Sequence, residues 1–159
     1  METMIHRQPR SGRLALCLLL AMCGCGGDDT TGPGEGPTAN PDFMVGDWLA
    51  TSMLLTSKAN PDVSVDLTTL GAVFSLSVQP SGRYTAIVEG YGQSSSESGT
   101  LTVEGPVVIF MRSLPTPDES RAQWQRDGTS VTLEADSEFD FNSDLTPEEA
   151  MLRTVFVPQ

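Results

Sequence analysis

The side chains that could carry chemistry in this chain are mainly carboxylates. Its 159 residues include 21 Asp and Glu, 9 Lys and Arg, one His and three Cys, for a formal net charge of −12. So few imidazole and thiol groups leave little for Cys–His or Ser–His–Asp catalysis, or for most zinc sites. Carboxylates alone could support glycoside hydrolysis, but no spacing in the sequence selects an acid–base pair. We therefore predict a protein that is not an enzyme and that has no cofactor.

One group of acidic residues near the C-terminus has a spacing known from metal sites. Asp140, Asn142 and Asp144 follow the D-x-N-x-D pattern with which a calcium loop begins. The pattern then fails, because Leu145 stands in place of the turn glycine and Met151 in place of the bidentate glutamate. The alternative is a solvated loop whose Asp and Asn side chains cap turns. We therefore expect no metal site. The calcium candidate, as the alternative, consists of these three residues.

The charge balance also limits the partners. Binding to nucleic acid requires clustered Lys and Arg to contact phosphates, and binding to anionic lipid headgroups requires them too. An excess of acidic residues therefore predicts no nucleic-acid partner and no electrostatic attachment to a membrane surface. A membrane attachment would need a different chemical basis.

The N-terminus has the pattern of a targeting segment. Arg7, Arg10 and Arg13 precede the apolar run 14–22, and Cys-Gly-Cys follows at 23–25. A positive region, a short apolar run and small residues are the parts of a secretory signal peptide. The run is too short for a permanent membrane-spanning helix, which needs about 20 apolar residues.

The end of this segment resembles the lipobox of bacterial lipoproteins, in which small residues precede a cysteine that becomes acylated. Gly24 directly before Cys25 suits that pattern best. Cys23 is the alternative, with Leu20 three residues before it and the large Met22 directly before it. The remaining alternative is a secreted protein whose cysteine stays unmodified.

The lipoprotein resemblance implies a location. Acyl chains such as palmitate on the N-terminal cysteine hold a protein firmly on a membrane when there is more than one of them. No Asp follows either candidate cysteine directly, which by resemblance to enterobacterial sorting favours the outer membrane. We therefore expect a protein of the bacterial cell envelope that contacts the membrane through its N-terminal lipid.

Three segments follow from this interpretation. Residues 1–24 are the signal peptide, 25–42 are the lipidated cysteine and a Gly-, Pro- and Asp-rich linker, and 43–159 are the folded domain. The linker contains too few apolar residues to offset its ordering entropy, so we predict a flexible tether. Cleavage before Cys25 removes His6 and leaves 6 basic against 20 acidic residues, a net charge of −14.

The domain shows the period-two alternation of half-buried strands. Phe74, Leu76 and Val78, for example, alternate with polar residues. Turn signals at 79–83 and at Asp127-Gly128 separate such runs. The short connections predict an all-β fold, a small antiparallel meander that closes into a barrel and so removes its edges. The eight predicted strands are 46–55, 71–79, 83–90, 98–104, 106–112, 121–126, 129–135 and 151–157.

Two connections carry further local predictions. Residues 94–98, Ser-Ser-Ser-Glu-Ser, are expected to form a mobile loop tip. Thr146-Pro147-Glu148-Glu149 has the capping-box spacing with proline at the first helical position, which predicts about one turn of helix.

The start of the first strand, Gly46-Asp47-Trp48, resembles the G-x-W motif of the lipocalins and the wider calycin superfamily. The resemblance covers the chain from Gly46 onward and implies an eight-stranded barrel with Trp48 closing one end. In that family the tryptophan stacks against an arginine of a late strand, for which Arg153 is the match here. The resemblance therefore implies a barrel-closing group of Gly46, Trp48 and Arg153.

The interior of the predicted barrel decides between two functions. In a ligand-binding barrel the aromatic side chains would line a cavity for a small apolar molecule or lipid, whereas in a filled barrel the same side chains are core. A filled barrel would instead serve as an interaction module, whose acidic face docks a basic partner in an envelope complex. Sequence leaves both readings open for Phe74, Tyr84, Phe110, Trp124 and Phe156.

Overall fold

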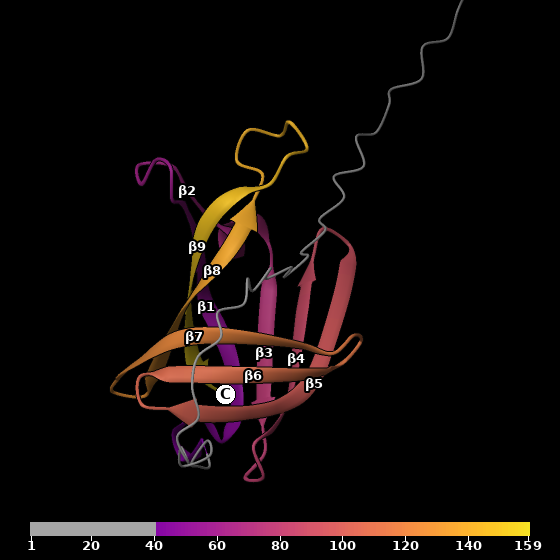
Figure 1. The fold of residues 1–159 in the computed structure, drawn as a ribbon, viewed down its shortest axis with the longest axis vertical. Helices are drawn as coiled ribbons and strands as arrows, with labels where there is room; N and C mark the ends of the chain where they lie inside the picture. Colours follow the sequence, from indigo (N-terminus) through magenta and orange to yellow (C-terminus); the bar gives the residue numbers. More distant parts are fainter. Residues whose placement is uncertain (1–40) are drawn as a thin grey trace, which may run out of the picture.

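The computed structural model describes residues 41–159, which form an antiparallel β-barrel (Figure 1). The predicted signal peptide 1–24, the lipidation candidates Cys25 and Cys23, and the linker up to residue 40 lie outside the described residues. No helix within 41–159 has the length and apolar character needed to span a lipid bilayer.

Strands make up nearly all the regular structure of this region, together with two short 3₁₀ turns. In chain order the elements are η1 (Asp42–Met44), β1 (Gly46–Ser57), β2 (Ser64–Asp66), η2 (Leu67–Leu70), β3 (Val73–Val78), β4 (Arg83–Gly90), β5 (Gln93–Glu104), β6 (Val107–Leu114), β7 (Asp118–Asp127), β8 (Ser130–Phe139) and β9 (Glu148–Pro158).

Pairing of the last strand with the first closes the sheet. From β3 to β9 each strand pairs antiparallel with the next, β3 also pairs with β1, and β9 returns to β1. That last ladder runs from Trp48 opposite Pro158 to Ser57 opposite Ala150. All of the described strands except β2 belong to the ring, and β2 pairs only with the second half of β1. The prediction of an all-β, eight-stranded antiparallel barrel is confirmed, and the architecture is consistent with a calycin-like fold.

The barrel has two different ends, a closed end and a cavity end. At the closed end lie η1 and the turns at 79–82, 105–106 and 128–129. At the cavity end lie η2 and the loops 58–63, 91–92, 115–117 and 140–147. Strand alternation points one set of side chains into the space between these ends. The most deeply buried of them include Met53, Leu55, Leu76, Leu101, Val108, Val131 and Phe156.

Both predicted turns form, the second of them one residue later than expected. Gly82 N donates to the Gln79 carbonyl oxygen over 2.9 Å, within the turn between β3 and β4. In the turn between β7 and β8, Asp127 pairs with Ser130. The two turn residues are therefore Gly128 and the residue after it, one position later than the predicted Asp-Gly pair.

The predicted loop tip at 94–98 is wrong, because these residues belong to β5. The hairpin turns earlier, between Gly90 and Gln93, where Tyr91 and Gly92 both have positive φ (52° and 74°). Positive φ at both turn residues is the requirement of the tight type I′ hairpin. The serines have no apolar alternation, but their backbone groups still pair with β4.

The predicted helical turn at 146–149 is also wrong. Glu148 begins β9 and pairs with Phe139 of β8, so the long ladder between these strands prevails over the local capping pattern. The 3₁₀ turns form elsewhere, at η1 and at η2, and neither turn nor β2 was predicted.

The pairing of β5 with β6 is irregular at Gly99. The register shifts between Ser98 and Gly99 because Ser113 is an extra, unpaired residue of β6, and a β-bulge bends the strand that carries the extra residue. In Figure 1, β6 and β7 cross the barrel at a steep angle to β3 and β4. A Cβ atom on Gly99 would overlap the Met111 carbonyl oxygen and lie 2.9 Å from the Arg112 Cα, so only glycine allows this approach.

Candidate functional site

The closed end is filled by side chains. Trp48 is 5% exposed and its indole Nε1 donates to the Met44 carbonyl oxygen of η1 over 2.7 Å. Phe43 stacks on Trp124 with ring centroids 3.8 Å apart, and Trp124 Nε1 donates to the Gly105 carbonyl oxygen over 2.9 Å. Turn η1 thus covers this end, through the hydrogen bond from Trp48 to Met44 and the stacking of Phe43 on Trp124.

The structure does not bring Trp48 and Arg153 together. Trp48 lies opposite Pro158 in the ladder between β1 and β9, whereas Arg153 lies opposite Leu54, in the other half of β1. Arg153 points outward, its side chain is 51% exposed, and its Nε lies 3.2 Å from Glu134 Oε1 on β8. The expected indole–guanidinium stack is therefore corrected: the register separates the two residues, and η1 covers Trp48 instead.

A cavity of about 160 Å³ lies at the opposite end of the barrel. Its wall is mainly apolar and comes from strands on both sides of the ring together with η2. A concave, mostly apolar space with a few polar groups is the usual form of a small-molecule site. The lining residues are Met53, Leu55, Leu67, Phe74, Ala86, Val88, Ser95, Ser96, Glu97, Arg112, Pro115, Ser137 and Leu152.

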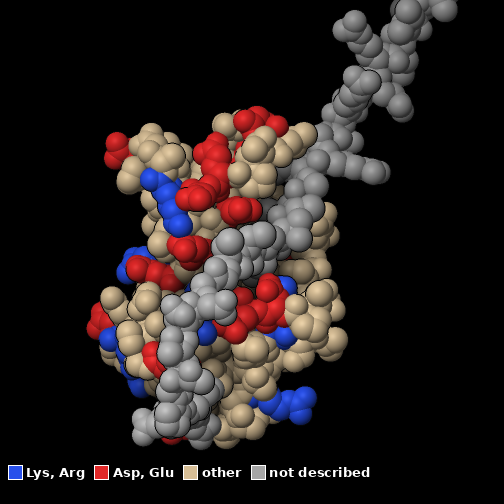
Figure 2. All heavy atoms as spheres, in the orientation of Figure 1, with Lys and Arg blue, Asp and Glu red and all other residues tan. Residues whose placement is uncertain are grey.

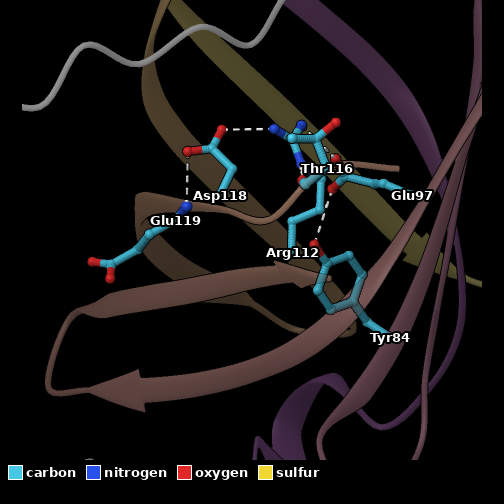
Figure 3. A network of polar contacts seen from close by, with 6 residues as sticks. All are labelled: Tyr84, Glu97, Arg112, Thr116, Asp118 and Glu119. Carbon is cyan, nitrogen blue, oxygen red and sulfur yellow. Dashed lines mark hydrogen bonds and ion pairs between the residues drawn. The ribbon is translucent and has the colours of Figure 1, made fainter. Parts of the chain in front are cut away.

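The polar part of the wall is a hydrogen-bonded network centred on Arg112 (Figure 3). Its Nη2 lies 2.8 Å from Asp118 Oδ2, its Nη1 3.5 Å from Glu97 Oε2, and its Nε donates to the Thr116 carbonyl oxygen over 2.8 Å. Tyr84 donates its hydroxyl to Glu97 Oε1 over 3.1 Å. One guanidinium is therefore held between two carboxylates, which leaves an excess of one negative charge.

The two residues of this network that line the cavity are held by local structure. Arg112 sits on β6 opposite Gly99, directly beside the bulge of β6, and Glu97 lies two residues before Gly99 on β5. The hydroxyl of Tyr84 is buried below Glu97, and this burial together with the nearby carboxylate raises the pKa of Tyr84 well above its ordinary value. Tyr84 therefore stays protonated and continues to donate its hydrogen bond to Glu97.

Turn η2 is fixed to the barrel by the carboxylate of Asp66. The carboxylate accepts bonds from Ser52 Oγ (2.7 Å) and the Met53 amide (3.1 Å) of β1, and from the Thr68 amide and hydroxyl (3.0 and 2.7 Å) of η2. Partial burial opposes the charge on Asp66, but these bonds outweigh it and lower its pKa to about 2. The anchored turn places Leu67 in the cavity wall.

The aromatic residues singled out in the sequence divide between lining and core. Phe74 lines the cavity and meets fully buried Phe156 edge-on, with centroids 5.1 Å apart. Tyr84 and Phe110 form a second edge-on pair at 5.2 Å below the cavity. Trp124 lies at the closed end. The interior is thus a packed core over most of its length and hollow at one end.

The acidic loop between β8 and β9 binds its own backbone. Asp140 accepts hydrogen bonds from the Asp144 and Leu145 amides, and Asn142 Oδ1 also accepts one from the Asp144 amide. The described residues contain no group of three or more His, Cys, Asp or Glu side chains arranged to hold a metal ion. These bonds match the turn-capping alternative for Asp140, Asn142 and Asp144.

The sequence did not single out Glu97 and Arg112, the charged residues of the cavity. Glu97 was hidden in a serine-rich segment without apolar alternation. Arg112 did carry a signal, because it follows Val108 and Phe110 at period two and therefore shares their inward face.

Comparison with known proteins gives no relative from which to transfer a role. No protein-family model matches this chain, and no curated protein or solved structure is significantly similar to it. What the chain does must therefore be inferred from its own barrel, its cavity and its N-terminal sequence.

Proposed function

We propose that this protein is a lipid-anchored lipoprotein of the bacterial cell envelope, at the outer membrane, that binds a small apolar molecule in its β-barrel without catalysing a reaction. The observation that carries the proposal is the apolar cavity of about 160 Å³ at one end of an otherwise packed barrel. The lipobox-like sequence ending at Cys25 supports the anchor.

The size of the cavity limits the ligand. A dry cavity of about 150 Å³ holds a benzene molecule, whereas sites for drug-sized ligands are about 300–1,000 Å³. The proposed ligand is therefore a ring or chain of about six to eight carbons, or one end of a longer acyl chain whose remainder lies outside the barrel.

The test is a substitution that fills the cavity. Val88 lines the cavity, and its neighbour Ile87 lies on the outer face of the same strand. Val88→Phe should abolish binding of hexan-1-ol, measured by chemical-shift changes in a nuclear magnetic resonance titration, because the added ring occupies the space. Ile87→Phe makes the matched change on the outside and should leave binding intact. Equal binding by both variants, or no binding by the unaltered protein, would contradict the proposal.

An acidic surface favours the alternative of a protein-interaction module. Glu134, Asp136 and Glu138 alternate outward along β8, and Glu138 lies directly opposite Glu149 of β9. Figure 2 shows acidic side chains gathered over these strands and the loop between them. Arg153 and Lys58 each pair with one of these carboxylates, which leaves an acidic excess that would suit a basic partner. Such binding would weaken with salt and would be unaffected by Val88→Phe.

A further inference from the structure

The charges in the cavity wall restrict the ligand further than its volume does. Among the lining residues, Glu97 and Arg112 are the two that carry a charge. The guanidinium of Arg112 already has partners on three sides: Asp118 at 2.8 Å, the Thr116 carbonyl oxygen at 2.8 Å and Glu97 at 3.5 Å. Its positive charge is therefore fully compensated within the protein.

An incoming carboxylate would meet an unfavourable potential here. The network holds two carboxylates against one guanidinium, and their side chains are only 19–31% exposed. Partial burial weakens solvent screening, so a third carboxylate near Glu97 would be repelled more strongly than at the surface. A fatty-acid headgroup would have to displace Glu97 or Asp118 from Arg112 in order to bind.

A hydrogen-bond donor, by contrast, finds a free acceptor. Glu97 Oε1 accepts the Tyr84 hydroxyl, but Oε2 has only the long 3.5 Å contact with Arg112. A carboxylate oxygen can accept two hydrogen bonds, so Oε2 can take one from a ligand that enters the cavity. An ammonium group would also offset the excess negative charge of the network.

We propose that the cavity selects apolar molecules that end in a primary amine or an alcohol, with Glu97 as the acceptor, and excludes the corresponding carboxylates. This inference rests on the proposed ligand-binding function and names the chemical class of the ligand. The apolar part of the molecule packs against the side of the wall formed by Leu55, Phe74 and Leu152.

The experiment compares three ligands of equal chain length: hexylamine, hexan-1-ol and hexanoate. Their dissociation constants for the purified full-length protein are measured by nuclear magnetic resonance titration at neutral pH, where the amine is protonated and the acid ionised. We expect hexylamine and hexan-1-ol to bind at least about ten-fold more tightly than hexanoate, because only the acid adds like charge. Hexanoate binding as tightly as the amine would overturn the selectivity.

Substitutions test whether the preference for the amine over the acid depends on the network of Glu97, Arg112 and Asp118. Glu97→Gln should reduce the amine-over-acid preference by about ten-fold, because it removes the acceptor charge. Asp118→Asn should also reduce the preference for the amine, and Asp118 is not one of the residues that line the cavity. This variant provides the test if Glu97→Gln fails to fold. Glu119→Gln, an exposed neighbour that pairs with Arg121, removes the same charge outside the cavity and should change nothing. An unchanged preference in the first two folded variants would overturn the role of the network.

The outcomes separate this inference from the function on which it rests. If all three ligands bind and Val88→Phe blocks them, but hexanoate binds best, then the barrel is a ligand carrier and only its selectivity is wrong. If none of the three binds, both the proposed function and the inference fail.

Discussion

At the scale of single residues, the cavity depends on polar side chains that the apolar pattern of the sequence does not reveal. Asp66 is the clearest case, because its carboxylate joins β1 to η2 through four hydrogen bonds. A carboxylate that accepts several hydrogen bonds in the folded state has a lowered pKa there, which links its charge to stability.

Asp66→Asn should therefore destabilise the protein in a pH-dependent way. The folded-state pKa of about 2 lies below the ordinary value of 3.8, so the charged carboxylate stabilises the fold above pH 3.8 and loses this effect as the pH falls toward 2. At neutral pH the substitution should lower the free energy of unfolding by about 1–2 kcal/mol.

Urea denaturation at a series of pH values measures this difference. The difference in the free energy of unfolding between Asp66→Asn and the unaltered protein should become smaller between pH 4 and 2. The control is Asp62→Asn, at an exposed position in the preceding loop, which should have the same free energy of unfolding as the unaltered protein. A gap that stays constant with pH would show that Asp66 acts through packing and not through its charge.

Residue-level predictions from sequence succeeded where a side chain's face follows from period-two alternation alone. Phe74 is in the cavity wall and Phe156 in the core, as their positions on inward faces allowed. The pairing of Trp48 with Arg153 was wrong because contact depends on strand register, which the sequence does not specify. The role of Glu97 depends on the place of β5 beside β4, and a polar serine run gives no sign of that pairing.

At the scale of elements, the bulge of β6 lies beside the polar part of the cavity wall. Arg112 directly precedes the extra residue Ser113, and Glu97 lies two residues before Gly99 on the facing strand β5, so the irregular pairing and the polar network share one location. Every strand of the ring could be predicted from its apolar run and from the turn signals around it, although the run in β6 is apolar on both faces. The strand β2, the turns η1 and η2, and the first half of β5 could not be predicted, because they are short or lack an apolar alternation.

Gly99→Ala should disturb both stability and binding. The new methyl group would overlap the Met111 carbonyl oxygen, which is backbone and cannot move aside easily. Overpacking of this kind costs about 1–3 kcal/mol, measured as a loss in the free energy of unfolding. Gly90→Ala is the matched control in the neighbouring strand, because its Cβ would lie at an ordinary distance of 3.4 Å from Ala72. Equal effects of the two substitutions would remove the special role of the bulge.

At the scale of the whole molecule, the barrel is packed at one end and hollow at the other. The existence of a closed barrel could be expected from eight short strands with short connections. The cavity could not be predicted, because its volume depends on how far side chains from opposite walls reach, and the same aromatic residues suit a filled or a hollow interior.

The proposed attachment of the whole molecule to a membrane depends on acylation of Cys25. In a host that acylates lipoproteins, Cys25→Ser should move the protein from the membrane fraction to the soluble fraction and abolish labelling with a palmitate analogue. Cys23→Ser is the matched control and should leave both unchanged. The reverse result would identify Cys23 as the acylated residue. An unaltered protein that stays in the soluble fraction and takes no label would mean that the protein is secreted without a lipid.

The entry of the chain at the closed end has a consequence for ligand exchange. Residue 41 leads into η1, which covers the closed end of the barrel, and the cavity lies at the far end of the strands. An acyl anchor attached upstream would join the barrel, through the predicted flexible linker, at the end opposite its cavity. The point of attachment would therefore leave the cavity free, and ligands would enter it from the surrounding aqueous space or from a membrane surface that the tethered barrel reaches.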